Sequence, residues 1–95
     1  MHPEDEVKAH IENDLPAQIR ALARQRGWTQ QELARRSGMK QSTISALMKP
    51  GGDTRNLRTL MRLARAFDCG LLVVFVPSEQ LIDWRRSFNP ENFVV

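Results

Sequence analysis

Four polar side chains lie close together near the middle of the chain: Lys40, Gln41, Ser42 and Ser45. A glutamine amide can form a bidentate pair with N6 and N7 of adenine, and a lysine can donate to O6 and N7 of guanine, whereas serine discriminates less. On one helix these residues would form a polar leading edge that a major groove of DNA can accept. A merely solvated helix face is the alternative, and it stays open for Gln41 and Ser42 taken alone.

Two short helices joined by a glycine turn would position this edge. Thr29, followed three residues later by Glu32, forms a capping-box pattern and predicts a helix from Gln30 to about Ser37, which Gly38 ends.

The second of the two helices is expected over residues 41–48, with Ile44 and Leu47 turned toward a core. The following segment, residues 50–52, is Pro-Gly-Gly and breaks the helix. Because Ile44 and Leu47 must face inward, the polar edge must project away from the core.

Two further helices would complete the support. Apolar residues follow helical spacing from Pro16 until Gly27, which predicts one helix. Because a proline disfavours helical backbone angles in the residue before it, here Leu15, we expect no unbroken helix across that point. Residues 1–14 therefore read as an acidic, weakly ordered segment. A fourth helix is expected after Asn56 as its N-cap, with Leu57, Leu60, Leu63, Ala64 and Phe67 on one face, and Gly70 ends it.

The run LLVVFV, residues 71–76, is β-branched and aromatic and is bounded by Gly70 and Pro77, which predicts a short strand. A lone strand cannot satisfy its own backbone groups, and the same strand of a second chain is the simplest partner. Extension of the preceding helix and pairing with residues 93–95 are the alternatives. A last short helix, capped by Ser78, should follow. The expected dimer interface is Leu72, Val74, Val76 and Trp84.

The fold class is therefore mainly α: a compact helix-turn-helix domain of four or five short helices, plus one short β-strand that pairs across a homodimer. The 95 residues suffice for one small domain, divided into the acidic segment 1–14, a DNA-binding unit 15–69 and a dimerisation strand with a C-terminal helix and tail, 70–95. The net charge of +3 is unevenly spread, since residues 15–70 hold eleven Lys and Arg against three acidic residues. A basic block of this kind suits a polyanion partner, although a basic soluble surface explains charge alone equally well.

Phosphate groups of DNA are expected to meet helix N-termini and flexible cations, which position the duplex without reading its sequence. The expected residues are Gln30, Thr43, Lys49 and Arg55. The other arginines of the basic block read as solvated helix faces that form no single stripe; they are Arg35, Arg36, Arg58, Arg62 and Arg65.

The segment GWTQQELARRSGMKQSTISAL resembles the DNA-binding domain of the lambda-repressor/Cro (XRE) family, and the resemblance covers roughly residues 16–69. The residues that carry it are Thr29-Gln30, Glu32-Leu33-Ala34, Gly38, Gln41-Ser42 and Ile44-Ser45. Within that family the chain is most similar to the HipB-like antitoxins and autorepressors. The resemblance implies base contacts from Lys40, Gln41, Ser42 and Ser45 and phosphate contacts from Thr29 and Gln30.

The chain departs from the family pattern at one pair of positions. Many members place an Arg in the first helix opposite a Glu after the recognition helix, and here Ala23 and Met48 stand at those positions. Losing both partners together is physically coherent because one buried charge alone would be costly. An apolar contact is expected in place of the ion pair.

The remaining residue types offer little for catalysis. His2 and His10 fall in the acidic segment without metal-ligand spacing, and the single cysteine, Cys69, reads as a small buried hydrophobe. We expect no enzyme and no cofactor. Trp84, Phe88 and Phe93 form a late aromatic cluster that either covers the dimer strand or docks a protein.

These observations predict a cytoplasmic, nucleoid-associated bacterial repressor that binds a palindromic operator in double-stranded DNA as a homodimer, with no membrane partner. By the resemblance, it would autoregulate a toxin–antitoxin operon. The alternative is an antitoxin that acts mainly by inhibiting a partner toxin, a HipA-like kinase, through protein contacts. A non-specific nucleic-acid module is disfavoured because stacking aromatics on a sheet are absent from the pattern.

Overall fold

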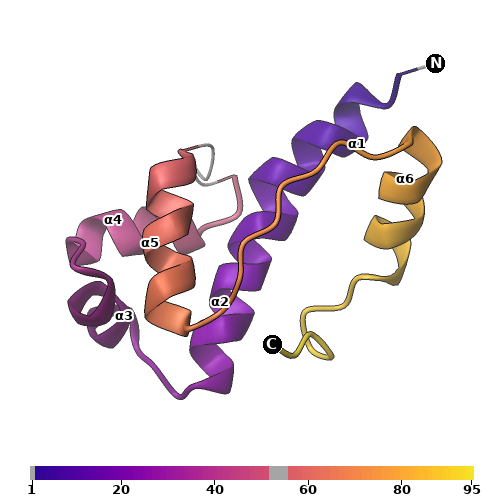
Figure 1. Cartoon of the computed structure of the whole chain (residues 1–95). Coiled ribbons are helices and arrows are strands. Elements are labelled where there is room, and N and C mark those ends of the chain that lie inside the picture. Colours follow the sequence, from indigo (N-terminus) through magenta and orange to yellow (C-terminus); the bar gives the residue numbers. More distant parts are fainter. Residues whose placement is uncertain (1, 52–55) are drawn as a thin grey trace.

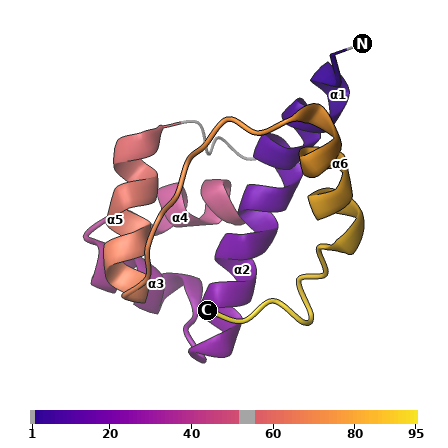
Figure 2. The same cartoon turned by 45° about the vertical axis from the view of Figure 1, so that its right-hand side comes forward.

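A computed structural model of the chain describes residues 2–51 and 56–95. Its elements in chain order are α1 (Glu4–Ala9), a π-helical stretch (His10–Asp14), α2 (Leu15–Gln25), α3 (Gln30–Ser37), α4 (Gln41–Met48), α5 (Leu57–Phe67) and α6 (Ser78–Ser87). The first three elements follow one another as a single long rod, with α3, α4 and α5 on one side of it and α6 beside its N-terminal part (Figures 1 and 2). No helix in the described ranges is long and apolar enough to span a bilayer.

A glycine with left-handed backbone angles follows each of the helices α2 and α3. Gly27, at φ 69°, follows α2 and lets the Trp28 amide donate to the Ala23 carbonyl at 2.9 Å. Gly38, at φ 70°, follows α3 in the same way, and the Met39 amide then reaches the Ala34 carbonyl at 3.1 Å. Both glycines thus end their helices as the sequence predicted, with backbone bonds that satisfy otherwise free carbonyls.

Replacement of Gly38 by alanine should lower the free energy of unfolding by about 1–2 kcal/mol, because an L-residue in the left-handed region brings its Cβ close to the backbone. Beyond the two neighbouring residues the added Cβ would meet no atom within 4 Å, so the loss comes from the backbone conformation. Denaturant unfolding of Gly38→Ala measures it. Gly70→Ala is the matched control, since Gly70 lies outside the left-handed region and is equally uncrowded. An equal loss in both variants would contradict this account.

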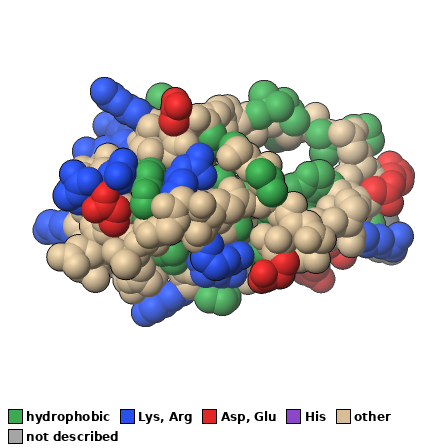
Figure 3. Space-filling model, turned by 90° about the horizontal axis from the view of Figure 1, so that it is seen from below, with side chains coloured by type: hydrophobic (Ala, Val, Ile, Leu, Met, Phe, Trp, Pro, Cys, Tyr) green, Lys and Arg blue, Asp and Glu red, His purple; other side chains and the backbone are tan. Residues whose placement is uncertain are grey.

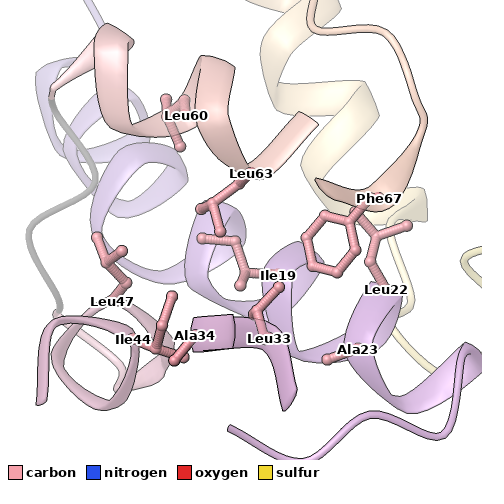
Figure 4. Close-up of a cluster of buried hydrophobic side chains, with 10 residues drawn as sticks. All are labelled: Ile19, Leu22, Ala23, Leu33, Ala34, Ile44, Leu47, Leu60, Leu63 and Phe67. Carbon is pink, nitrogen blue, oxygen red and sulfur yellow. The ribbon is translucent and has the colours of Figure 1, made fainter. Parts of the chain in front are cut away.

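The core joins α2, α3, α4 and α5. Leu33 of α3 and Ile44 of α4 are both 0% exposed, and Figure 4 shows their side chains converging with those of the other helices. The buried cluster is Ile19, Leu22, Ala23, Leu33, Ala34, Ile44, Leu47, Leu60, Leu63 and Phe67. As predicted, Ile44 and Leu47 anchor α4 and so fix which of its faces points outward. Leu57 is an exception among the predicted core residues, because it begins α5 and is 54% exposed.

The expectation that no continuous helix runs into Pro16 is wrong, and Glu4–Asp14, within the segment expected to be weakly ordered, is helical. α1 is a regular helix, and Leu15 has helical backbone angles (φ −65°, ψ −47°) despite the proline that follows it. The transition is made through the π-helical stretch, in which the Leu15 amide donates to the carbonyl of His10, five residues back. A π-turn of this kind lets a helix adjust its register where the ordinary pattern is interrupted.

Pro16 is among the most completely buried residues, and its missing N–H has a structural consequence. In an α-helix, the amide of residue 16 would donate to the carbonyl of Glu12. Here that carbonyl accepts from the Gly51 amide at 2.7 Å, beyond the end of α4. The proline therefore frees a backbone group that ties the long rod to the loop after α4.

The C-terminal region is attached to the rod through α6. Arg85 donates from Nε to Oδ2 of Asp14 at 2.7 Å and also pairs with Glu6, and these contacts raise the pKa of Arg85, chiefly through the bond to Asp14. Nδ1 of His10 lies 3.1 Å from Oδ2 of Asp14, and the His10 and Trp84 rings form a T-shaped pair with centroids 5.0 Å apart. His10 thus packs between the rod and α6, although it belongs to the segment that the sequence predicted to be weakly ordered.

Two local details also differ from the prediction. α5 ends at Phe67 because Asp68 takes the left-handed conformation (φ 55°), two residues before the expected Gly70. Aspartate tolerates this conformation better than most residues. Ser78 is the first helical residue of α6 rather than its cap, which is Pro77.

Residues 71–77 form an extended segment that is neither helix nor strand in the single chain. The alternative that Leu71–Val76 extends the fourth helix is therefore wrong, since α5 stops at Phe67. Along this segment the apolar side chains are exposed, and Phe75 is fully so. Residues 93–95 do not pair with it as a strand; Phe93 instead packs against the core and against Phe88.

Candidate nucleic-acid interface

The outward face of α4 carries the residues predicted to contact bases. Lys40 is the N-cap of this helix in an extended conformation, and Gln41 and Ser42 form its exposed first turn. Ser45, one turn later, is half-buried. No side chain caps the N-terminus of α4, so its first amides face outward together with these polar groups. Three of the four predicted residues thus lie at the N-terminal end of α4, and Ser45 follows one turn later.

The other end of α4 is held by hydrogen bonds from the rod. Arg20 of α2 donates from Nη1 to the carbonyl of Met48, the last residue of α4, and the Glu12 carbonyl accepts from Gly51 three residues further on. Sequence reasoning missed both contacts, because neither residue type nor local spacing identifies them. Together they fix the C-terminal end of α4 relative to α2.

Ala23 and Met48 occupy the positions where the family often has an ion pair. Ala23 is 1% exposed within the buried cluster, and Met48 packs against that cluster. Both positions are therefore part of, or next to, the apolar core, and a direct contact between Ala23 and Met48 stays a prediction. The polar connection between α2 and the end of α4 is provided by Arg20 instead.

The residues predicted to contact phosphate lie at the start of α3 and around α4. Thr29 and Gln30 are exposed at the N-terminus of α3, and Thr43 and Lys49 are exposed on α4 and directly after it. The Thr29 Oγ1 accepts from the Glu32 amide at 3.1 Å, which leaves its hydroxyl proton free to donate outward. Arg55 lies outside the described residues.

The capping box that the sequence predicted is only half formed. Thr29 caps Glu32 as expected, but the Glu32 carboxylate does not turn back toward Thr29. It accepts from Arg35 (2.6 and 3.0 Å) and from Arg36 (2.7 Å), one turn ahead. These bonds, the one to Arg35 above all, lower the pKa of Glu32 to about 2. The carboxylate therefore stays charged wherever the protein is folded at ordinary pH.

This shift predicts a definite pH dependence. Because the pKa of Glu32 falls from 4.5 to about 2 on folding, its contribution to stability is complete above pH 4.5 and is lost as the pH falls through about 2. Carboxyl-detected NMR titration should show Glu32 as the glutamate with the lowest midpoint. As the pH falls from 4.5 to about 2, the free energy of unfolding of Glu32→Gln should therefore decrease less than that of the parent protein. A Glu32 midpoint near 4.5 would contradict the observed pairing.

Four arginines that the sequence analysis interpreted as parts of solvated helix faces line one surface hollow between α3 and α5. Arg35 and Arg36 come from the last turn of α3, and Arg62 and Arg65 come from α5, with the Ser37–Gly38 backbone between them. Figure 3 shows basic side chains concentrated at the end of the molecule that holds α3, α4 and α5, with most of the acidic ones in view at the opposite end. The spacing within each helix could not reveal this, because the two pairs meet only when α3 packs on α5.

The residues predicted for a dimer interface are accessible on the single chain. Leu72 is 83% exposed and Val74 59%, whereas Val76 and Trp84 are near one-third exposed. Trp84 is stacked on Phe88 with ring centroids 4.8 Å apart, so the predicted aromatic cluster forms within one chain. The apolar segment is therefore free to meet another surface.

Comparison with known proteins gives two matches. Residues 19–74 match the sequence profile of the helix-turn-helix family. Over 68 residues the chain is 35% identical to the competence pilus inhibition repressor of Acinetobacter baylyi, an alignment that covers 72% of this chain and 61% of that protein. The chain thus corresponds to somewhat less than two thirds of the length of this relative. No solved structure matches it.

Proposed function

The chain belongs to the XRE-type helix-turn-helix family of DNA-binding proteins, and from this we propose that it is a transcriptional repressor that reads a palindromic operator as a homodimer. The observation that carries the proposal is the orientation of α4. Its apolar residues Ile44 and Leu47 are buried, and Lys40, Gln41 and Ser42 are exposed on the leading edge. A helix held in this way can insert its N-terminal end into a major groove.

Base recognition would then rest on three kinds of contact. Gln41 can bind the N6 and N7 edge of adenine, Lys40 can donate to guanine, and the hydroxyls of Ser42 and Ser45 can adapt to either. We assign the flanking phosphates to Thr29, Gln30, Thr43 and Lys49, which are exposed at the start of α3, on α4 and directly after it. We extend this assignment to Arg55 from its place in the sequence alone.

Dimerisation would proceed through the extended segment Leu71–Val76. Its six consecutive apolar side chains are all at least 36% exposed, and its backbone has no strand partner within the described chain. Pairing with the same segment of a second copy about a two-fold axis would satisfy that backbone and cover the apolar side chains. Two copies of α4 would then enter successive major grooves about 34–36 Å apart, which calls for a palindrome.

Repression would follow from occupancy, since a dimer bound at a promoter excludes polymerase. The name of the Acinetobacter relative, a repressor, supports this direction of regulation. We further propose, from the resemblance to HipB-like proteins, that the chain represses its own operon. Its second candidate role is that of an antitoxin, which the exposed apolar segment favours because the same surface could dock a toxin kinase. A kinase-like gene next to its own would support that role.

Selection of bound duplexes from a random library at fixed, near-physiological salt tests the proposal. A palindrome with half-sites about one helical turn apart is the expected result. Recovery of no consensus, with affinity that collapses as salt rises, would mean that the basic surface contacts phosphates only. Recovery of a single half-site without its mate would refute the homodimer while leaving sequence reading intact.

A further inference from the structure

We propose that the hollow between α3 and α5 is a docking site for an acidic segment of a partner protein, separate from the DNA-reading face. The hollow is lined by Arg35, Arg36, Arg62 and Arg65, with the backbone of residues 37–38 between the two pairs. It is an open groove on the surface rather than an enclosed cavity, so it suits an extended chain better than a small ligand. This site goes beyond the DNA binding described above.

The charge of the hollow is largely unbalanced. Among the described residues, Glu32 pairs with two of these arginines, and with a pKa of about 2 it supplies a single negative charge, shared by Arg35 and Arg36. Arg62 and Arg65 are exposed and have no ion-pair partner among the described residues. Four like charges gathered in this way repel one another unless an anion joins them. An occupant with two or more carboxylates would relieve this repulsion and match the charge of the hollow.

Two arginines of the hollow already bind a carboxylate within the chain. Arg35 donates two parallel hydrogen bonds, from Nε and Nη2, to the Glu32 carboxylate. This is the bidentate geometry by which guanidinium groups recognise carboxylates. Arg36 lies over the Trp28 ring, 4.3 Å from its centroid, and Trp28 is in turn stacked on the buried Phe67 at 5.7 Å. A guanidinium held on a rigid aromatic stack loses little freedom when it binds, which favours association.

The position of the hollow favours a protein over nucleic acid as its occupant. Its lining residues come from the end of α3, from Gly38 and from α5, whereas the assigned DNA contacts are at residues 29–30, 40–49 and 55. The two sets share no residue, so a duplex on α4 leaves the four arginines available. Aspartate and glutamate side chains on an extended segment of a partner would fill the hollow while the operator stays bound.

NMR titration of the full chain tests the proposal. The probe is a synthetic peptide of alternating Glu and Gly residues, with the Gln-for-Glu peptide, inorganic phosphate and a non-operator duplex as comparators. The acidic peptide should cause saturable amide shifts at residues 35–38 and 62–66, and the Gln peptide none. In Arg62→Gln/Arg65→Gln the Kd for the acidic peptide should rise about tenfold. Arg58→Gln/Arg86→Gln, with the same change in net charge, should bind the peptide as well as the parent does.

Three results would overturn the assignment. If the amide shifts do not saturate with the acidic peptide, the hollow is not a binding site for it. Equal weakening in both double variants would reduce the effect to net charge. Stronger shifts at the same residues with the duplex would assign the hollow to nucleic acid. Operator binding by Arg62→Gln/Arg65→Gln, measured in parallel, should be unchanged, so that failure of the docking site is distinguished from failure of the repressor function.

Discussion

Replacement of Gln41 by alanine is expected to weaken operator binding by about 5- to 150-fold for each half-site, which corresponds to the 1–3 kcal/mol of a bidentate base contact. Gln41 is exposed in the first turn of α4 and contributes nothing to the buried cluster, so the fold should be unaffected. Titration of the operator and of its single-base variants at fixed salt measures the loss of affinity and identifies the base pair that causes it. Preference should relax mainly at one base pair, the one that Gln41 contacts.

A matched control separates base reading from the chemistry of the substitution. Gln80→Ala makes the same change at an exposed position of α6, far along the chain from α4, and operator affinity should not change. Thermal unfolding of both variants should resemble that of the parent. If Gln41→Ala keeps the full pattern of base preference, the residue has been wrongly assigned and α4 must read the operator through other side chains.

Replacement of Val74 by aspartate should abolish the dimer. If Leu71–Val76 pairs with its own copy across a two-fold axis, the substitution places two carboxylates close together in a desolvated interface. The expected cost is about 3 kcal/mol or more, which weakens self-association more than 100-fold. Affinity for the palindrome should fall with it, because each half-site is then bound independently. Sedimentation equilibrium and operator titration measure the two effects.

The monomer itself should tolerate this change, since Val74 is 59% exposed in the single chain. Circular dichroism should therefore show an unaltered helical fold. Val94→Asp is the control: it places a charge at an exposed residue of the C-terminal tail and should leave the dimer unchanged. A Val74→Asp protein that remains a dimer would show that another surface joins the two copies.

The sequence by itself determined the supporting frame of the candidate site. The bounds of α3 and α4, the left-handed stops at Gly27 and Gly38 and the cap at Asn56 all follow from interactions within a few residues. The burial of Ile44 and Leu47 follows from helical periodicity, which also determines that Gln41 and Ser42 face outward. Such features can be predicted because each depends on only one turn or one helix.

The tertiary structure decided what depends on distant partners. Pro16 suggested a break, yet the helix continues through it because a π-turn absorbs the interruption and Gly51 takes up the freed carbonyl of Glu12. The acidic segment looked unstructured because the charge partner of its Asp14, Arg85, lies 71 residues later. No local rule connects such residues.

The same distinction applies to the charged surface. The arginines of α3 and α5 form no stripe in the sequence, since neither helix alone carries enough of them on one face. They become one hollow only when Leu33 and Leu63 join the same core and bring the two helices together. Helix limits and inward faces follow from short-range chemistry that the sequence displays directly, whereas the surfaces between helices exist only once the core has packed.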